Sequence, residues 1–230
     1  MIHAFGRPDP PVPRLLASLA ERGHRVGGPS EGASDDRATL VLAAGTGADP
    51  LALGPLFDRW RRARGGRVMV MSSLGAHPDA KTRRLRELWR LEEGARNAGL
   101  PLLVLRLAPL VGPRSPLWLR LRARPRLPGG GRQLLNPVAE ADVVDTIEKA
   151  VLGNVEWRGW YELAGPEVVS LAEMVELAAI SGPRLPTHAG AWEPPMSELL
   201  EHRLAEANHW LVHFGLSPRP LTACVEPGVQ

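Results

Sequence analysis

The sequence predicts an α/β fold in which a mostly parallel β-sheet is covered by helices on both faces. Short apolar segments alternate with longer amphipathic ones through most of the 230 residues, which is typical of successive β-α units. Hydrophobic residues make up 44% of the chain and charged residues 23%, a balance that suits a protein with a buried core. This length is enough for one such domain and a small additional lobe.

The individual elements follow from residue spacing. Five apolar segments predict β-strands, at residues 1–5, 24–27, 39–44, 67–73 and 101–107. Amphipathic segments predict helices at residues 14–22, 51–64 and 80–98. In the second helix Leu53, Leu56, Phe57 and Trp60 recur at the spacing of a buried face. Residues 114–132 are rich in Arg, Pro and Gly and predict a loop. After this loop the pattern predicts a helix at 140–152, a strand at 160–163, a helix at 170–180 and a last helix near 196–214.

Composition limits the classes of function. The net charge is only +3, which does not indicate a nucleic-acid partner. The single cysteine, Cys224, excludes a disulfide within the chain and a cysteine-based zinc site. No apolar run reaches the roughly 18 residues of a membrane span, and the start of the chain does not have the pattern of a secretory signal. We therefore expect a cytoplasmic protein, with attachment at the periphery of a membrane complex as an open alternative.

Five segments, in order, carry a resemblance to a known family. They are the first 26 residues, VMVMSSLGA (68–76), LEEGARNAGLPLLVLRLAPLVGP (91–113), NPVAEADVVDTIEKAV (136–151) and GWYELAGPEVVSLAEMVELA (159–178). Together they resemble the atypical and extended short-chain dehydrogenase/reductase proteins, the NAD(P)-binding relatives of nucleotide-sugar epimerases, over residues 1–180. The resemblance implies a Rossmann-like doubly wound sheet with a small C-terminal lobe. It also implies a core at 1–137, the C-terminal part of the same fold at 138–195, and a terminal amphipathic helix and tail at 196–230.

The glycine-rich loop of that family is degenerate in this chain. Three glycines let the loop approach the cofactor's pyrophosphate, and the resemblance places them at Gly6, Asp9 and Val12. Only the first is glycine. The prolines at 10, 11 and 13 have no N–H to offer a phosphate, and Asp9 adds a negative charge. We expect no bound cofactor; NAD(P) in a shifted position through Gly6, Ala43, Ala44 and Gly45 is the alternative.

The sheet is also expected to be shortened at one edge. Only about a dozen residues separate the second predicted strand from the third. The family places a strand and a helix in this interval, and these residues are too few for both. The missing edge would remove half of the adenine pocket.

The catalytic pair of the family is missing too. Its reductases and epimerases use Tyr-x-x-x-Lys, in which the lysine lowers the tyrosine's pKa for proton transfer. The resemblance places these two positions at Leu85 and Trp89, and the motif occurs nowhere in the chain. Ser72 and Ser73 remain as catalytic candidates, and the alternative is that a serine at a strand end has an ordinary structural role.

Two further groups of residues were candidates for binding. On the expected last helix Glu198, His202, Glu206, His209 and His213 fall on one face. Such a stripe suits a solvated helix face or a zinc or nickel site, and we expect no metal. The second group gathers arginines around a tryptophan and suits a partner protein, a membrane surface or a small anionic ligand. Its members are Arg114, Trp118, Arg120, Arg122, Arg124 and Arg126.

These observations predict a catalytically degenerate protein of this fold that acts as a structural or accessory subunit, or as an interaction module. The expected partner is a protein or a larger complex. Two alternatives stay open: a redox-neutral isomerase or cyclase that uses the old substrate cleft, and a sensor that binds NAD(P) without turning it over.

Overall fold

The computed structural model describes residues 1–5, 11–27, 38–43, 53–153, 155–206 and 208–224. Within it the chain forms two compact units. Unit 1 comprises Met1–Arg106 and Val144–Tyr161, and unit 2 comprises Leu107–Val143 and Glu162–Gln230. The chain passes between the units three times, so each unit joins segments that are distant in sequence.

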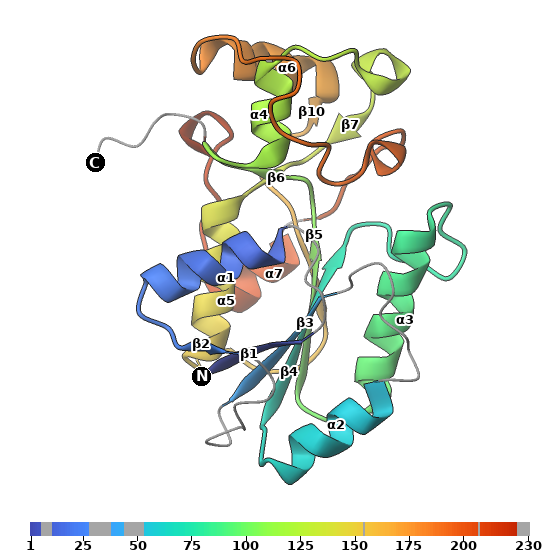
Figure 1. Cartoon of the computed structure of the whole chain (residues 1–230), viewed down its shortest axis with the longest axis vertical. Helices are drawn as coiled ribbons and strands as arrows, with labels where there is room; N and C mark the ends of the chain where they lie inside the picture. The colour runs from blue at the N-terminus through green and yellow to red at the C-terminus, as the bar shows by residue number, and fades with distance from the viewer. Residues whose placement is uncertain (6–10, 28–37, 44–52, 154, 207, 225–230) are drawn as a thin grey trace. The chain divides into compact units, whose positions relative to one another are not determined.

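Six strands form the sheet, in the order β2-β1-β3-β4-β5-β9 (Figure 1). Their bounds are β1 Ile2–Phe5, β2 Val26–Gly27, β3 Thr39–Ala43, β4 Arg67–Ser73, β5 Leu102–Leu107 and β9 Trp160–Leu163. Strand β1 pairs in parallel with both β2 and β3, and β3 pairs in parallel with β4. The mostly parallel, Rossmann-like sheet predicted from the sequence is confirmed. Within the described residues β2 is its outer strand on one side; the short connection at 28–37 lies outside them.

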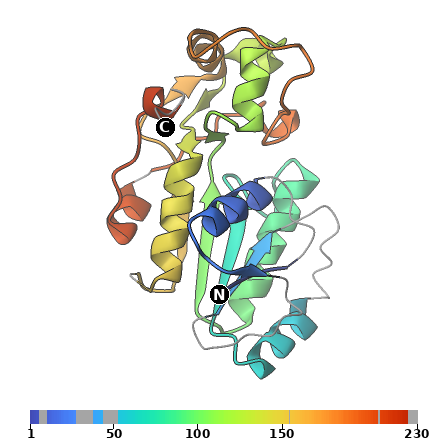
Figure 2. The same ribbon diagram turned by 60° about the vertical axis from the view of Figure 1, so that its left-hand side comes forward.

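Helices cover both faces of this sheet. Figures 1 and 2 show α2 and α3 on one face and α1 with α5 on the other. Their bounds are α1 Val12–Glu21, α2 Leu53–Arg62, α3 Arg83–Asn97 and α5 Glu140–Val151. The predicted apolar face of α2 is confirmed, since Leu53, Leu56, Phe57 and Trp60 all lie in the core with residues of α3, β3 and β4.

Unit 2 is built from shorter elements around a core of its own. Strands β7 and β10 pair antiparallel, and β6 and β8 pair in parallel. The strands are β6 Leu110–Val111, β7 Leu134–Leu135, β8 Val138–Ala139 and β10 Val169–Ser170. The helices are α4 Pro116–Arg122, α6 Leu171–Ile180 and α7 Asn208–Phe214, with 3₁₀ turns at Pro128–Gly131, Met196–Glu198 and Thr222–Cys224.

The loop predicted at 114–132 is wrong in its first half, which forms α4. The Ser115 hydroxyl accepts a hydrogen bond from the Trp118 N–H and caps the helix, and Pro116 occupies the first turn, where its missing N–H costs nothing. Leu117, Trp118 and Leu121 bury one side of the helix. A serine cap, a proline and apolar residues at helical spacing were therefore present in the sequence.

The continuous last helix predicted near 196–214 is also wrong. A 3₁₀ turn covers Met196–Glu198, and α7 begins only at Asn208. Between them the backbone bonds to another segment: Arg203 N–H donates to the Leu134 carbonyl, and Asn136 N–H donates to the Arg203 carbonyl. The polar stripe that depended on one helix is therefore not formed.

Candidate functional site

Ser72 lies at the carboxyl end of β4 and is committed to a buried carboxylate. Its hydroxyl donates to Oε1 of Glu92 at 2.5 Å. Ser72 is 4% exposed and Glu92, which projects from α3, is fully buried. The other candidate, Ser73, is also buried, and its carbonyl accepts from the Ala76 N–H in the turn that follows. Neither serine presents a side chain on an open surface.

The carboxylate of Glu92 also binds a guanidinium. Arg106 on β5 donates from Nη2 to Oε2 at 2.7 Å and from Nε to Oε1 at 3.0 Å. The Arg106 side chain is 16% exposed. Burial of a charge has a desolvation cost. For the Glu92 carboxylate, the ion pair with Arg106 and the hydrogen bond from Ser72 offset this cost.

The guanidinium of Arg106 then lies over the Trp160 ring, 4.7 Å from its centroid. Trp160 opens β9 and is 47% exposed. A continuous line of contacts thus runs from the Ser72 hydroxyl, through an ion pair, to an indole at the surface of unit 1. Sequence reasoning missed Glu92 and Arg106, although an arginine inside the apolar strand LLVLRL was a signal.

The two positions at which the family resemblance expects tyrosine and lysine hold apolar side chains that pack in or against the core. Leu85 is 1% exposed, and Trp89 packs against the same core. The chain's only tyrosine, Tyr161, lies on β9, and its hydroxyl donates to the Arg158 carbonyl at 3.1 Å. Burial raises the pKa of this phenol above its ordinary value, which makes it a poorer proton donor or acceptor at neutral pH.

Of the four residues named for a shifted cofactor, only Ala43 lies within the described residues. Gly6, Ala44 and Gly45 lie outside the described residues, as does Asp9. Ala43 ends β3, where it is paired with Met71.

The first turn of α1 has few free N–H groups that could bind a phosphate. Pro11 is its N-cap and makes no side-chain cap, and Pro13 has no N–H. The N–H groups of Arg14 and Leu15 donate to the Pro11 carbonyl at 3.0 and 3.2 Å. The Leu15 bond is the first regular bond of the helix, so among the four starting positions Pro11 and Pro13 have no N–H and the N–H of Arg14 is already bonded.

Trp118, which was named with the arginines of 114–126 as a candidate contact residue, is buried. This side chain is 1% exposed in the core of unit 2, and its Nε1 donates to the Ser181 hydroxyl at 3.3 Å. It cannot contribute to a surface for a partner or a membrane.

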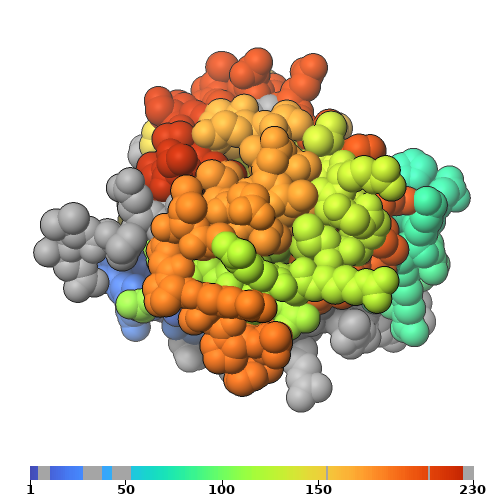
Figure 3. All heavy atoms as spheres, turned by 90° about the horizontal axis from the view of Figure 1, so that it is seen from above, coloured from blue at the N-terminus to red at the C-terminus, as the bar shows by residue number. Residues whose placement is uncertain are grey.

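Two of the arginines hold the chain's own segment 183–192. Arg120 donates to the Thr187 carbonyl and its guanidinium lies 5.6 Å from the Trp192 ring centroid. Arg122 donates to the Pro183 carbonyl at 3.0 Å. Figure 3 shows this segment, in orange, against the green α4 region on one face of the molecule. The remaining three, Arg114, Arg124 and Arg126, are exposed.

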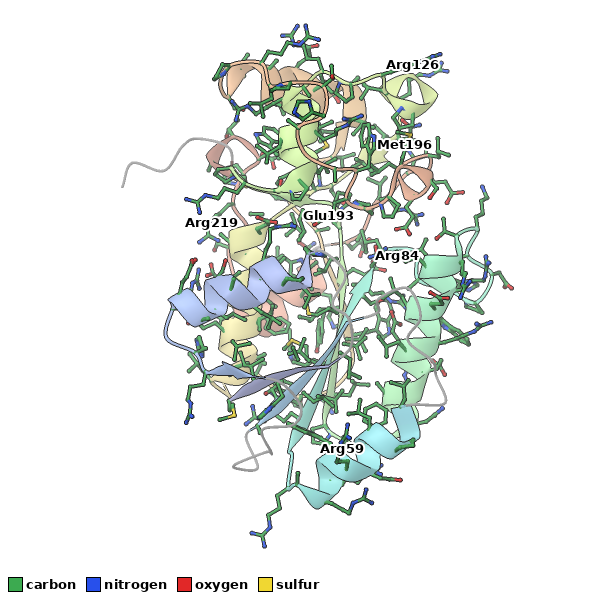
Figure 4. All side chains as sticks on the ribbon, in the orientation of Figure 1. Arg59, Arg84, Arg126, Glu193, Met196 and Arg219 are labelled. Atoms are coloured by element: carbon green, nitrogen blue, oxygen red, sulfur yellow. The ribbon has the colours of Figure 1, made fainter. Side chains whose placement is uncertain are left out.

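A pocket of about 740 Å³ lies beside this region in unit 2. Arg120, Arg126 and Met196 line it together with Leu127, Pro128, Gly129 and Gly130; Arg126 and Met196 come from different segments and are marked in Figure 4. The two glycines have φ of 56° and 70°, a left-handed turn that glycine accommodates without strain. Two guanidinium groups beside an apolar wall suit an anionic ligand with an apolar body.

The described residues hold no group of three or more His, Cys, Asp and Glu side chains placed to bind a metal ion. His202 of the expected stripe instead accepts a hydrogen bond at Nδ1 from the Leu134 N–H at 2.9 Å. No helix in the described ranges combines the length and the apolar character needed to cross a membrane.

Solved structures of the NAD-dependent epimerase and dehydratase type share this fold. UDP-glucose 4-epimerase of Thermotoga maritima aligns with a TM-score of 0.65 and 14% identity, over 97% of both chains. The NAD-dependent NDP-hexosamine 5,6-dehydratase TunA aligns with a TM-score of 0.68 and 14% identity, over 97% of this chain and 94% of its own. WbmH of Bordetella bronchiseptica, solved with NAD⁺, aligns with a TM-score of 0.68 and 15% identity, over 99% of this chain and 96% of its own. The sequence matches no protein-family model and no curated protein. The likeness confirms the predicted fold, and at these identities it extends to the fold alone.

Proposed function

We propose that this chain, which has the fold of NAD-dependent epimerases and dehydratases, is a catalytically degenerate protein that acts as an accessory subunit or interaction module. The observation that carries the proposal is the environment of Ser72. Its hydroxyl is bonded to the buried Glu92–Arg106 pair. At the positions where the resemblance expects the family's proton-transfer residues, Leu85 is buried and Trp89 packs against the core.

Proton transfer needs a titratable group within hydrogen-bond reach of the substrate and with a pKa near the working pH. Leucine and indole supply no such group. Tyr161, the single tyrosine, is bonded to a backbone carbonyl and has a raised pKa. These features support a role without dehydrogenase or epimerase chemistry.

The start of α1 supports the expectation that no dinucleotide is bound. Pro11 and Pro13 have no N–H, and the N–H of Arg14 already has an acceptor. This turn does not fit the diphosphate of NAD(P), whose charge depends on free helix-terminal donors.

Turnover assays test the loss of chemistry. We expect no conversion of UDP-glucose or UDP-glucuronate in the presence of NAD⁺, for the native chain and for Ser72→Ala alike. Product formation by the native chain would contradict the proposal, and its loss in Ser72→Ala would assign the activity to this serine.

Isolation from the native source tests the binding role. The proposal expects a partner protein at a fixed stoichiometry. A lone monomer that carries a small molecule would oppose it.

A second candidate function, a redox-neutral enzyme, is favoured by the pocket of unit 2 with Arg120 and Arg126. Calorimetric titration with UDP-glucose tests it. This candidate expects saturable binding that Arg126→Gln weakens and that Arg114→Gln, an exposed arginine outside the pocket lining, leaves unchanged. Equal binding by both variants, or none, would reject it.

A further inference from the structure

A separate groove of about 290 Å³ lies in unit 1 beside the outer strand β9. Leu102 and Val104 of β5 line it, as do Trp157 and Trp160. Leu102 and Trp160 are the first residues of their strands. The groove therefore adjoins the amino ends of these strands, whereas sheets of this type bind nucleotides beyond the carboxyl ends.

Both indoles at the groove are held in place. Trp157 Nε1 donates to the Ala150 carbonyl at 3.1 Å, and Arg67 lies 5.1 Å from its ring centroid. Trp160 has Arg106 on its ring in the same manner. A cation over an aromatic face contributes about 0.5–1 kcal/mol at an exposed site, so each ring has a preferred position before any ligand arrives.

The position of Arg106 is in turn set from inside the unit. Glu92 accepts two of its hydrogen bonds and is itself bonded to Ser72. A half-exposed tryptophan is thus fixed by a buried ion pair. Ordering side chains in advance lowers the entropic cost of binding, which distinguishes Trp160 from an isolated apolar residue on a surface.

Two arginines supply charge at the groove. The side chain of Arg158 is 78% exposed and pairs with Glu156 at 3.0 Å. That of Arg96 is 47% exposed and pairs with Glu93 one turn away on α3. Exposed pairs of this kind contribute only about 0–1 kcal/mol, so an incoming anion can replace the glutamates. The planar guanidinium binds carboxylate or phosphate through two hydrogen bonds.

We propose that this groove binds a small planar aromatic acid, with its ring on Trp160 and its carboxylate or phosphate at Arg158 and Arg96. The volume is near the lower end of small-ligand sites, about 300 Å³, and accommodates a one- or two-ring compound. Ser72, Glu92 and Arg106 are positioning residues that act through Trp160. The inference goes beyond the proposed function and does not depend on the loss of catalysis.

The full chain labelled with ¹⁵N tests this site through its tryptophan indole N–H signals, with 2-naphthoate as the probe and neutral 2-naphthamide as its control. Saturable shifts are expected at Trp157 and Trp160 with naphthoate and much weaker ones with the amide. Equal binding of both probes, or shifts confined to tryptophans of unit 2, would overturn the proposal.

Variants separate the contributions of ring and charge. Trp160→Ala and Arg158→Gln should each weaken naphthoate binding by at least about fivefold, as expected for loss of a stacked ring or a charge-assisted hydrogen bond. The matched control Arg114→Gln removes an exposed arginine of unit 2 and should have no effect. Unchanged affinity in Trp160→Ala would also overturn the assignment.

Glu92→Gln tests the positioning role. We expect the indole signal of Trp160 to move in the free protein while the signals of the unit 2 tryptophans stay, and naphthoate binding to weaken about threefold or more. A purely structural Glu92 would lower the melting temperature and leave the Trp160 signal and the affinity unchanged.

Discussion

The ion pair between Glu92 and Arg106 illustrates how a single buried charge constrains its neighbours. Glu92 is fully buried, Arg106 binds it at two points, and the Ser72 hydroxyl donates to Oε1. Each of these polar groups is tolerable only because the others are present. The serine that the sequence offered as a catalytic candidate is explained by this network.

Removal of one partner of the Glu92–Arg106 pair should therefore destabilise the protein more than replacement of both partners. Glu92→Ala is expected to lower the free energy of unfolding by about 3–5 kcal/mol, because it leaves the Arg106 charge without its partner. Ser72→Ala should cost about 1.5–3 kcal/mol, the range for a hydrogen bond to a charged group. Urea denaturation measures both.

The double variant Glu92→Leu/Arg106→Met is the control, and it should be more stable than Glu92→Ala alone. A double variant no more stable than Glu92→Ala would contradict the claim that the unpaired Arg106 charge causes the loss.

A second ion-pair group predicts a pH dependence. Glu148 on α5 accepts from His24 Nε2 at 2.7 Å and from Arg22 Nη1 at 2.7 Å. The hydrogen bond with His24, and then that with Arg22, lowers the pKa of Glu148 below its ordinary 4.5 against the opposing effect of burial. A carboxyl group with a lowered pKa stabilises the folded state above its unfolded pKa, and this contribution is lost as the pH falls through the folded value.

Glu148→Gln should accordingly destabilise the protein near neutral pH, and its difference from the native chain should shrink once the pH falls below about 4.5. Urea denaturation across that range gives the measurement. Glu176→Gln, an exposed glutamate on α6, should show no such trend. A difference for Glu148→Gln that grows with acidification would contradict this assignment.

Among the elements, α4 and the segment after α6 form one packed assembly in unit 2. A β-carbon added to Gly190 would lie 2.3 Å from the Pro116 carbonyl oxygen and 2.4 Å from the Arg120 nitrogen, and its φ is 69°. Gly130 has nearly the same φ, 70°, and nothing within 4 Å. The two positions share a backbone conformation and differ in their surroundings.

Gly130→Ala should therefore cost about 1–2 kcal/mol, the strain of a left-handed residue. Gly190→Ala should cost about 1–3 kcal/mol more, because segment 183–192 must move away from α4. Thermal unfolding of both variants checks the difference. Equal destabilisation would mean that this segment is not held closely against α4.

The elements with clear periodicity were predictable and those held by distant contacts were not. The strand at 160–163 and the helix at 170–180 follow from alternation and from the Ser170 cap, whose hydroxyl accepts from Glu173 N–H. Residues 199–207 have a helical pattern, yet Asn136 bonds both the N–H and the carbonyl of Ala205. Such tertiary hydrogen bonds override local preference, and nothing within the segment itself reveals them.

Part of the candidate site was likewise visible in advance. Ser72 was identified at the end of a predicted strand, which is a local feature, and the family resemblance supplied the positions Leu85 and Trp89. The link from Glu92 to Arg106 and Trp160 was not, since it joins residues on α3, β5 and β9. The burial of Trp118 depended in the same way on packing against α6.

As a whole, the chain has the sheet and helix layers of solved NAD-dependent epimerases and dehydratases. It aligns with such proteins over nearly its full length at 14–15% identity. Fold and chemistry are separable, because packing requires apolar patterns and catalysis requires a few side chains in place. Unit 1 and unit 2 offer binding features of their own, the groove at β9 and the pocket beside α4.

Titration of the intact chain with NADH and NADPH, followed through tryptophan fluorescence, tests whether the chain binds a nicotinamide dinucleotide. Our account predicts no saturable signal below about 1 mM, a dissociation constant that corresponds to about −4 kcal/mol. Saturable binding in the micromolar range would contradict it and would favour a nucleotide sensor.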